Sequence, residues 1–273
     1  INFAHDAIFM FGAAAAYYLF SVWLPFSDPA AGLALVGLLA LGLTFSGFAS
    51  GSLAPLVERL AYRPLRQRGA ARLAFLISAV GASFFITYLF QQRFLLGTAE
   101  RPFPGFMAPE TALTISGAAV NNRRVLTVVV AIALLIFLDR FVRLSKTGRG
   151  IRAVAEDIDA ARMMGVNVNK IIATTFIVGG FFGGIAGFCY GLVFSKVAWN
   201  LGFIPGIKAF TAAVLGGIGN LRGAVLGGIT LGLIENMSAL CIGSEWKNPI
   251  AFTVLVLVLI FRPTGILGEG LSK

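Results

Sequence analysis

The first polar residues of the sequence lie immediately before a long uncharged run. Their side chains are of types that could take part in acid–base catalysis or bind a metal. Asn2, His5 and Asp6 lie close together, and His5 is the only histidine in the sequence. The two cysteines, Cys189 and Cys241, are far from it and from each other, and no hydrophobic segment carries a close pair of carboxylates. A catalytic or metal site needs such groups to converge. We therefore predict no catalytic residue, no metal site and no enzymatic activity in this chain.

The segments that must position these side chains are those of a membrane protein. Of 273 residues 58% are hydrophobic and only 12% are charged, and the mean hydropathy is +0.87. A helix crosses a hydrocarbon core with roughly 20 apolar residues, and continuously apolar runs indicate helices rather than barrel strands. We predict an all-α, polytopic transmembrane fold with about 7–8 membrane segments, some short or broken. The clearest runs are Ala7 to Pro25, Pro29 to Val57, Leu73 to Gln92 and Ile171 to Ser195.

The net charge of +10 comes mainly from two basic loops. By the positive-inside rule both loops are cytoplasmic. The positive charge therefore does not indicate a nucleic-acid partner, and we expect the chain to contact membrane lipid. The chain between them must leave the cytoplasm and return, through an external loop from Gly97 to Asn122 and a span from Arg123 to Leu144 whose end arginines snorkel to the surface. The loop cations are Arg59, Arg63, Arg66, Arg68 and Arg72, then Arg140, Arg143, Lys146, Arg149, Arg152, Arg162 and Lys170.

Charged residues interrupt the apolar sequence toward the end of the chain. Lys208, Arg222 and Glu235 divide it into pieces of about a dozen residues, too short to span alone, before a last span from Asn248 to Phe261 that Pro263 stops. Ionisable residues inside membrane segments are functional candidates. We expect Lys208 to snorkel to the surface or to lie near an outer gate, and Glu235 to pair with Asn236 or an arginine.

A regular glycine pattern predicts close helix packing. Gly179, Gly183, Gly187 and Gly191 recur every four residues and so form one smooth ridge on a helix. Such ridges let a second helix approach closely, which predicts a tight bundle.

The segment from about 145 to 170 has the character of a docking loop. As a helix from Gly150 to Met164 it places Val154, Ile158 and Ala161 on one stripe, and Gly165 suits the left-handed position after a helix end. An acidic patch does not favour anionic lipid, so a protein groove fits this helix better. The patch consists of Glu156, Asp157 and Asp159.

Several stretches resemble one family of permeases. Asp159, Ala160, Ala161 and Gly165 reproduce, with Asp for Glu, the E-A-A, three residues, G loop of ABC-importer permeases. Four further stretches, in order along nearly the whole chain, resemble the LivH-type permease subunit of the branched-chain amino acid ABC importer family. They are INFAH from residue 1, ERLAYRPLR from Glu58, GFIPGIKAFTAAVLGGIGNLRGAVLGG from Gly202 and FRPTGILGE from Phe261.

The resemblance implies a type II-like ABC importer permease, with residues 1–273 forming one transmembrane domain in a bacterial inner membrane. It implies a second homologous permease subunit, two ABC ATPase subunits and a periplasmic substrate-binding protein as partners. No G-x-x-x-x-G-K-[ST] phosphate loop occurs, so we expect no cofactor on this chain, with ATP and Mg²⁺ on the partner subunits. The loop with Glu156, Asp157, Asp159, Ala160, Ala161 and Gly165 is then the ATPase-coupling segment. The family usually begins with a further apolar segment, and it has Gly where this chain has Asp6.

The polar residues at the start then gain a second interpretation. If Asn2 or Asp6 caps a helix that begins near Ala7, the free N–H groups at its N-terminus offer an amino acid carboxylate a place to pass. The alternative is that both are ordinary caps and that His5 bonds a buried carbonyl. The predicted substrate path comprises Asn2, His5, Asp6, Lys208, Phe210 and Asn220.

Two alternatives stay open at this point. Urea and short-amide importers use similar permeases, and the pore residues do not separate a zwitterion from a neutral amide. The second alternative is an ion-coupled secondary carrier or channel that uses His5, Lys208 and Glu235. It gives no role to the loop with Ala160, Ala161 and Gly165.

Overall fold

The computed structural model describes residues 2–26, 29–115, 117–262 and 264–268. The chain divides into two compact units, Ile1–Gly202 and Phe203–Lys273. Among the described residues seven helices are long and apolar enough to cross a membrane. The predicted all-α, polytopic fold is confirmed, and two short two-stranded ribbons accompany the helices.

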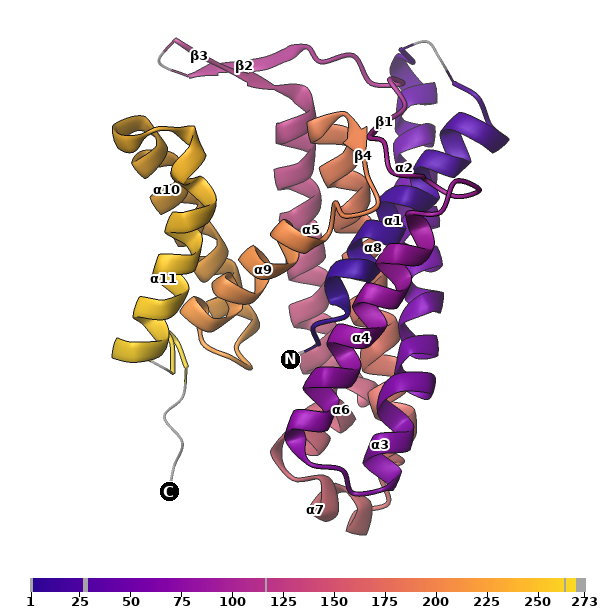
Figure 1. Cartoon of the computed structure of the whole chain (residues 1–273), viewed down its shortest axis with the longest axis vertical. Helices are drawn as coiled ribbons and strands as arrows, with labels where there is room; N and C mark the ends of the chain where they lie inside the picture. Colours follow the sequence, from indigo (N-terminus) through magenta and orange to yellow (C-terminus); the bar gives the residue numbers. More distant parts are fainter. Residues whose placement is uncertain (1, 27–28, 116, 263, 269–273) are drawn as a thin grey trace. The chain divides into compact units, whose positions relative to one another are not determined.

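The first unit consists mainly of long helices, two of which continue into a π-helical turn, and its longest connection lies between α4 and α5 (Figure 1). Pairs of elements run on without a break: α1 into η1, and α2 through η2 into α3. In order the elements are α1 His5–Tyr18, η1 Leu19–Trp23, α2 Gly32–Val57, η2 Glu58–Tyr62, α3 Arg63–Gln67, α4 Arg72–Phe90, α5 Asn122–Leu144, α6 Lys146–Glu156, α7 Ile158–Met163 and α8 Val168–Phe194.

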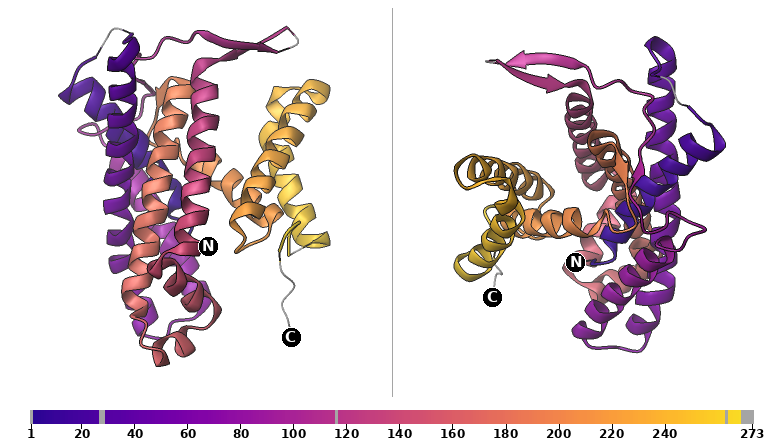
Figure 2. Two further views of the ribbon diagram at one scale, coloured as in Figure 1. Left: turned by 180° about the vertical axis from the view of Figure 1, so that it is seen from behind. Right: turned by 45° about the horizontal axis from the view of Figure 1, so that its top comes forward.

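Helix α8 is the centre of this unit, because it packs against both α1 and α2 (Figures 1 and 2). The contacts are made through backbone atoms. A Cβ added to Gly184 would stand 2.2 Å from the carbonyl oxygen of Ser46 on α2, and one added to Gly187 would stand 2.1 Å from that of Phe9 on α1. Only glycine permits such close approach; Gly187 belongs to the predicted four-residue pattern, and Gly184 does not.

The predicted external loop is a folded segment rather than an open one. Strand β1 (Arg101–Pro102) pairs with β4 (Lys196–Val197), and β2 (Thr111–Ile115) pairs with β3 (Ala118–Asn121), both antiparallel. Between them Phe106 is fully buried, with its ring centroid 4.8 Å from that of Phe20. Aromatic burial therefore fixes this segment to the helices below it.

The prediction that Arg123 snorkels to the surface is wrong. The side chain is 8% exposed, and its guanidinium donates to the carbonyl oxygens of Met107 and Leu192 and to the hydroxyl of Ser195. Asn121 caps α5 by accepting a bond from the backbone N–H of Arg123. The folded segment before α5 and the end of α8 together supply these acceptors, which makes burial of this cation favourable.

The second unit contains α9 (Phe203–Gly216), α10 (Leu221–Ile242), the 3₁₀ turn η3 (Ser244–Trp246) and α11 (Lys247–Phe261). The sequence predicts that charges divide this region into pieces too short to span a membrane. Only α9, with 14 residues, is that short. Helix α10 runs for 22 residues, because Arg222 lies in its first turn and Glu235 is paired. Pro263, predicted to stop the last helix, lies outside the described residues.

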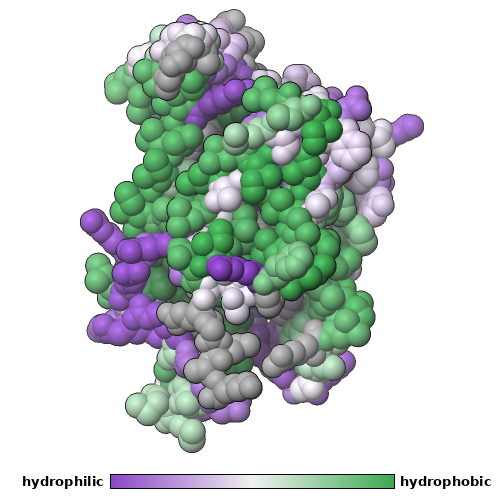
Figure 3. Space-filling view, turned by 90° about the vertical axis from the view of Figure 1, so that its left-hand side faces the viewer, coloured by the Kyte–Doolittle hydropathy of each residue, from purple (hydrophilic) through white to green (hydrophobic). Residues whose placement is uncertain are grey.

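In the view of Figure 3, apolar residues make up most of the visible surface, and hydrophilic residues gather in patches. Leu33 on α2 and Leu240 on α10 are each 89% exposed. Large aliphatic side chains this exposed suit contact with lipid. The chain is therefore a multi-pass membrane protein.

Candidate functional site

A polar cluster surrounds the start of α1. The helix begins at His5 rather than near Ala7, and its N-cap residue is Ala4, which makes no side-chain cap. Asp6 lies inside the first turn, where its Oδ1 accepts from the backbone N–H of Ala7 at 2.6 Å and from the hydroxyl of Ser83 at 2.7 Å. The prediction that Asn2 or Asp6 is the N-cap is corrected: both side chains bind backbone N–H groups there, but from other positions.

Asn2 and His5 complete this cluster. Oδ1 of Asn2 accepts from the backbone N–H of Ala4 at 3.0 Å and from the hydroxyl of Tyr62 at 2.6 Å. The imidazole of His5 lies over Gly183 of α8, where an added Cβ would stand 2.9 Å from its Cε1. The structure thus brings Asn2, His5 and Asp6 together, and links them to η2, α4 and α8.

The loop after β4 returns to this cluster. A Cβ on Gly202 would stand 1.9 Å from the carbonyl oxygen of Asp6, so the backbone at this position lies directly against the first turn of α1. Any side chain here would displace the start of the helix.

The glycines of α8 lie on two faces rather than on one ridge. Gly183, Gly187 and Gly191 meet His5, the backbone of α1 and the ring of Phe103, whereas Gly180 and Gly184 meet α2. Gly179, the first member of the predicted ridge, has no atom within 4 Å of an added Cβ. A helix turns about 100° per residue, so a four-residue spacing drifts slowly around the axis and the first member leaves the contact.

The predicted coupling segment is two helices rather than one. Helix α6 ends at Glu156, and Asp157 is the N-cap of α7. Its Oδ1 accepts hydrogen bonds from the backbone N–H groups of Asp159 at 2.8 Å and Ala160 at 3.0 Å. These two bonds hold the pKa of Asp157 below its usual range. Because of the break, the predicted stripe does not form as one face: Ala161 is buried but Ile158 is exposed.

The end of α7 has the predicted geometry and a distinct surface. Gly165 adopts φ +79°, a left-handed conformation that suits glycine after a helix. Met163 and Met164 just before it are each 83% exposed. The acidic patch is partly neutralised, because Arg162 pairs with Asp159 at 3.0 Å. Exposed methionines beside charged groups are typical of a surface that adapts to a protein partner.

In the second unit, Lys208 and Glu235 pair with each other. The Lys208 ammonium lies 2.8 Å from Oε1 of Glu235, with side chains 28% and 13% exposed. Glu235 therefore pairs with Lys208, not with Asn236 or an arginine as predicted. Lys208 points to this carboxylate and does not simply snorkel to the surface. Asn220 is the N-cap of α10, accepting from the backbone N–H of Gly223, and Phe210 lies half-buried on α9.

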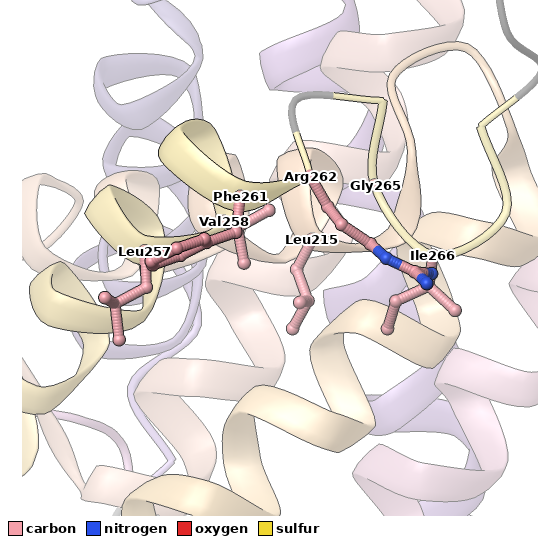
Figure 4. Close-up of a pocket in the computed structure, with 7 residues that line it drawn as sticks. All are labelled: Leu215, Leu257, Val258, Phe261, Arg262, Gly265 and Ile266. Carbon is pink, nitrogen blue, oxygen red and sulfur yellow. The ribbon is translucent and has the colours of Figure 1, made fainter.

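A small cavity of about 250 Å³ lies in the same unit, at the end of α11 (Figure 4). Its lining has one cationic side chain, no carboxylate and otherwise apolar groups. An amino acid needs partners for both its ammonium and its carboxylate, so we do not assign this cavity to such a substrate. The lining residues are Leu215, Leu257, Val258, Phe261, Arg262, Gly265 and Ile266.

Comparison with known proteins identifies the family. The family model described as "Branched-chain amino acid transport system / permease component" matches residues 1–259. The chain belongs to this permease family. The resemblance noted in the sequence is confirmed, and the protein is a membrane-spanning permease subunit rather than an enzyme.

Named relatives agree along almost the full length. The High-affinity branched-chain amino acid transport system permease protein BraD of Pseudomonas aeruginosa is 37% identical, covering 98% of this chain and 86% of its own. The permease protein LivH of Escherichia coli K12 is 33% identical with the same coverage. The xylose permease XylH of that organism is 25% identical over 69% of this chain. No solved structure matches this permease.

One pair of residues in this permease escaped prediction from the sequence. Glu58 belongs to the stretch ERLAYRPLR, and its side chain is 1% exposed and paired with Arg66 at 2.7 Å. The available signal was an opposite charge eight residues later, at the end of a span.

Proposed function

We propose that this permease carries branched-chain amino acids into the cytoplasm as one subunit of an ABC importer of a bacterial inner membrane. The observation that carries the proposal is the full-length similarity to permeases named for branched-chain amino acids. The apolar neighbours of the polar cluster support it, because Phe9 and Phe11 would suit an aliphatic side chain. Asn2, His5 and Asp6 supply polar groups beside them.

The energy comes from partners in this proposal. Two ABC ATPase subunits hold ATP and Mg²⁺, a second permease completes the pathway, and a periplasmic binding protein delivers substrate. The segment α6–α7 is the proposed contact with an ATPase, supported by the exposed Met163 and Met164 and by the left-handed turn at Gly165. An apolar and acidic helix end of this kind suits a protein groove.

The test uses the complete importer reconstituted in liposomes that contain ATP. Uptake of labelled leucine, isoleucine and valine is measured beside urea and acetamide, with a protonophore in a parallel sample. We expect ATP-dependent uptake of the branched-chain amino acids that resists the protonophore. Preferential uptake of urea or acetamide would assign the amide class instead, and uptake that collapses with the protonophore in ATP-loaded vesicles would contradict an ABC importer.

Gly165 gives a test of coupling with a matched control. A β-branched side chain is strongly disfavoured at φ +79°, whereas Asn tolerates this conformation. No atom lies within 4 Å of an added Cβ, so the two variants differ in backbone preference rather than in crowding. Gly165→Val should separate ATP hydrolysis from uptake while Gly165→Asn retains both. Normal uptake by Gly165→Val would count against the assignment of this segment.

A further inference from the structure

A buried carboxylate lies where the second membrane helix leaves its span. Glu58 opens the π-helical turn η2, and its side chain is 1% exposed. Arg66 of α3 neutralises it, with Nη2 2.7 Å from Oε1. A buried charge persists only when it is paired and hydrogen-bonded. This pair therefore fixes η2 against α3.

The same arginine connects η2 to the cytoplasmic segment. Nη2 of Arg66 also donates to Oδ1 of Asn169 at 3.0 Å. Asn169 lies in the first turn of α8, just after α7 and Gly165. A displacement of α7 that moves the start of α8 therefore acts on Arg66 and on the carboxylate that Arg66 holds.

The other end of η2 connects to the polar cluster. Tyr62, 7% exposed, donates its hydroxyl to Oδ1 of Asn2 at 2.6 Å. Its ring lies against Phe75 of α4 and Phe176 of α8, with centroids 6.5 Å and 5.3 Å away. Packing on two helices means that the hydroxyl cannot move without the turn that carries it.

The turn itself is suited to change. Single π-helical turns inside α-helices are rare and are frequent at functional sites. η2 sits between two regular helices, α2 and α3, so a local rewinding there alters the relation of Glu58 to Tyr62 without breaking the membrane span. Glu58 at the first position of η2 is bound by Arg66, which also donates to Asn169, and Tyr62 at the last position of η2 donates to Asn2.

We propose that η2 transmits displacement of the segment 146–167 to the N-terminus of α1, through the Arg66–Asn169 and Tyr62–Asn2 hydrogen bonds. The inference rests on the proposed contact of that segment with an ATPase. Arg66, Asn169 and Tyr62 are positioning residues: they set the place of Asn2 and of the polar cluster when the partner moves. Energetic coupling between two sites requires an element that both sites bias, and η2 is that element.

Two mild substitutions test the route without leaving a buried charge unpaired. Asn169→Ala removes the acceptor for Arg66 and leaves the Glu58–Arg66 pair intact. Tyr62→Phe removes one hydroxyl and keeps the packed ring. In the reconstituted importer we expect each to raise the ATP hydrolysed per substrate imported by about fivefold or more, in the range usual for coupling between sites. The double variant should exceed the larger single effect by little, because both bonds act in series.

Controls separate this role from a structural one. Thr174→Ala removes a hydroxyl that bonds only within α8, to the carbonyl of Lys170, and should leave the ratio unchanged. Asn169→Asp keeps an oxygen acceptor for Arg66 and should restore coupling. Protein amount and thermal midpoint are measured for every variant, and these should match the unsubstituted permease.

The outcomes that overturn the proposal differ from those that overturn the function. An unchanged ratio in Asn169→Ala or Tyr62→Phe, with Gly165→Val still uncoupled, would refute transmission through η2 and leave the importer assignment standing. Independent, multiplying effects in the double variant would refute it as well. Normal coupled uptake in Gly165→Val would overturn the assignment of the coupling segment and this route together, whereas the importer function is overturned by the substrate and protonophore assay described above.

Discussion

The ammonium of Lys208 on α9 lies 2.8 Å from Oε1 of Glu235 on α10 and joins the two helices inside an apolar unit. The pair explains how α10 can carry a carboxylate in mid-span. Each charge makes the other tolerable, and neither is stable there alone.

The Lys208–Glu235 pair gives the first prediction. Lys208→Met leaves the carboxylate unpaired and should destabilise the permease by about 3 kcal/mol, the lower end of the range for buried pairs, because Lys208 keeps 28% exposure. Replacing both, as Lys208→Met with Glu235→Leu, should recover most of this loss. The thermal midpoint in detergent measures it. A double variant no more stable than Lys208→Met would mean that the pair has a role other than mutual neutralisation.

Two glycines of α8 predict opposite effects of one methyl group. Gly184→Ala places a Cβ 2.2 Å from the carbonyl oxygen of Ser46 and 2.7 Å from the Ser50 side chain, so the helices must separate. We expect a loss of about 2 kcal/mol, typical of overpacking. Gly179→Ala meets nothing within 4 Å and should be neutral or stabilising by about 0.5 kcal/mol through helix propensity. Equal thermal midpoints for the two variants would contradict the packing described.

Arg123 predicts a local change in protection. Arg123→Met leaves the carbonyl oxygens of Met107 and Leu192 without the guanidinium that binds them. An unpaired buried acceptor costs about 1–3 kcal/mol, so the segment from Phe103 to Met107 should open more often. Hydrogen exchange of that segment should become faster while α10 stays unchanged. Arg123→Lys offers a single ammonium in place of the guanidinium, so its exchange rate should lie between those of the unsubstituted permease and Arg123→Met. Unaltered exchange in Arg123→Met would show that the aromatic packing holds this segment alone.

Asp157 predicts a pH dependence at the break between α6 and α7. Bonds from the backbone N–H groups of Ala160 and Asp159 lower its pKa in the folded state. The stabilising contribution is therefore complete above the ordinary aspartate pKa and is lost as the pH falls through the lowered folded value. Carboxyl ¹³C NMR should show this residue titrating below the usual aspartate range. Asp157→Asn keeps an oxygen acceptor and should hold the cap without pH dependence; a normal midpoint for Asp157 would mean that the cap is not formed.

The membrane helices were predictable because the constraint on them is local. A span needs about 20 apolar residues wherever it lies, and α1, α2, α4 and α8 follow the uncharged runs, whereas α5 was predicted from the need to return to the cytoplasm between the two basic loops. The left-handed Gly165 was equally readable, because one residue type suits that conformation.

Pairings across the fold were not predictable in the same way. Lys208 and Glu235 were both singled out, yet their contact depends on the packing of α9 against α10, which no spacing reveals. Burial of Arg123 depends on the carbonyl groups of Met107 and Leu192, which meet it only when the segment before α5 and the end of α8 have folded around it. At Asp157 the capping signal was present, but Glu156 and Asp159 are also acidic, and the hydrogen bonds alone decide which residue caps.

The pairing of Arg101 with Val197 has a consequence for how this protein is made. Val197 follows α8 in the sequence, so β1 has no partner until that helix has been synthesised and inserted. During translation Phe106 can already meet Phe20, but β1 must wait while α5, α6 and α7 emerge, and Phe103 must wait for Phe188 on α8. Contacts between distant parts of a chain form late and leave apolar surface open to aggregation or proteolysis meanwhile. The β1–β4 pairing, and the hydrogen bond from Arg123 to Ser195 beside it, can therefore form only after α8 has been made.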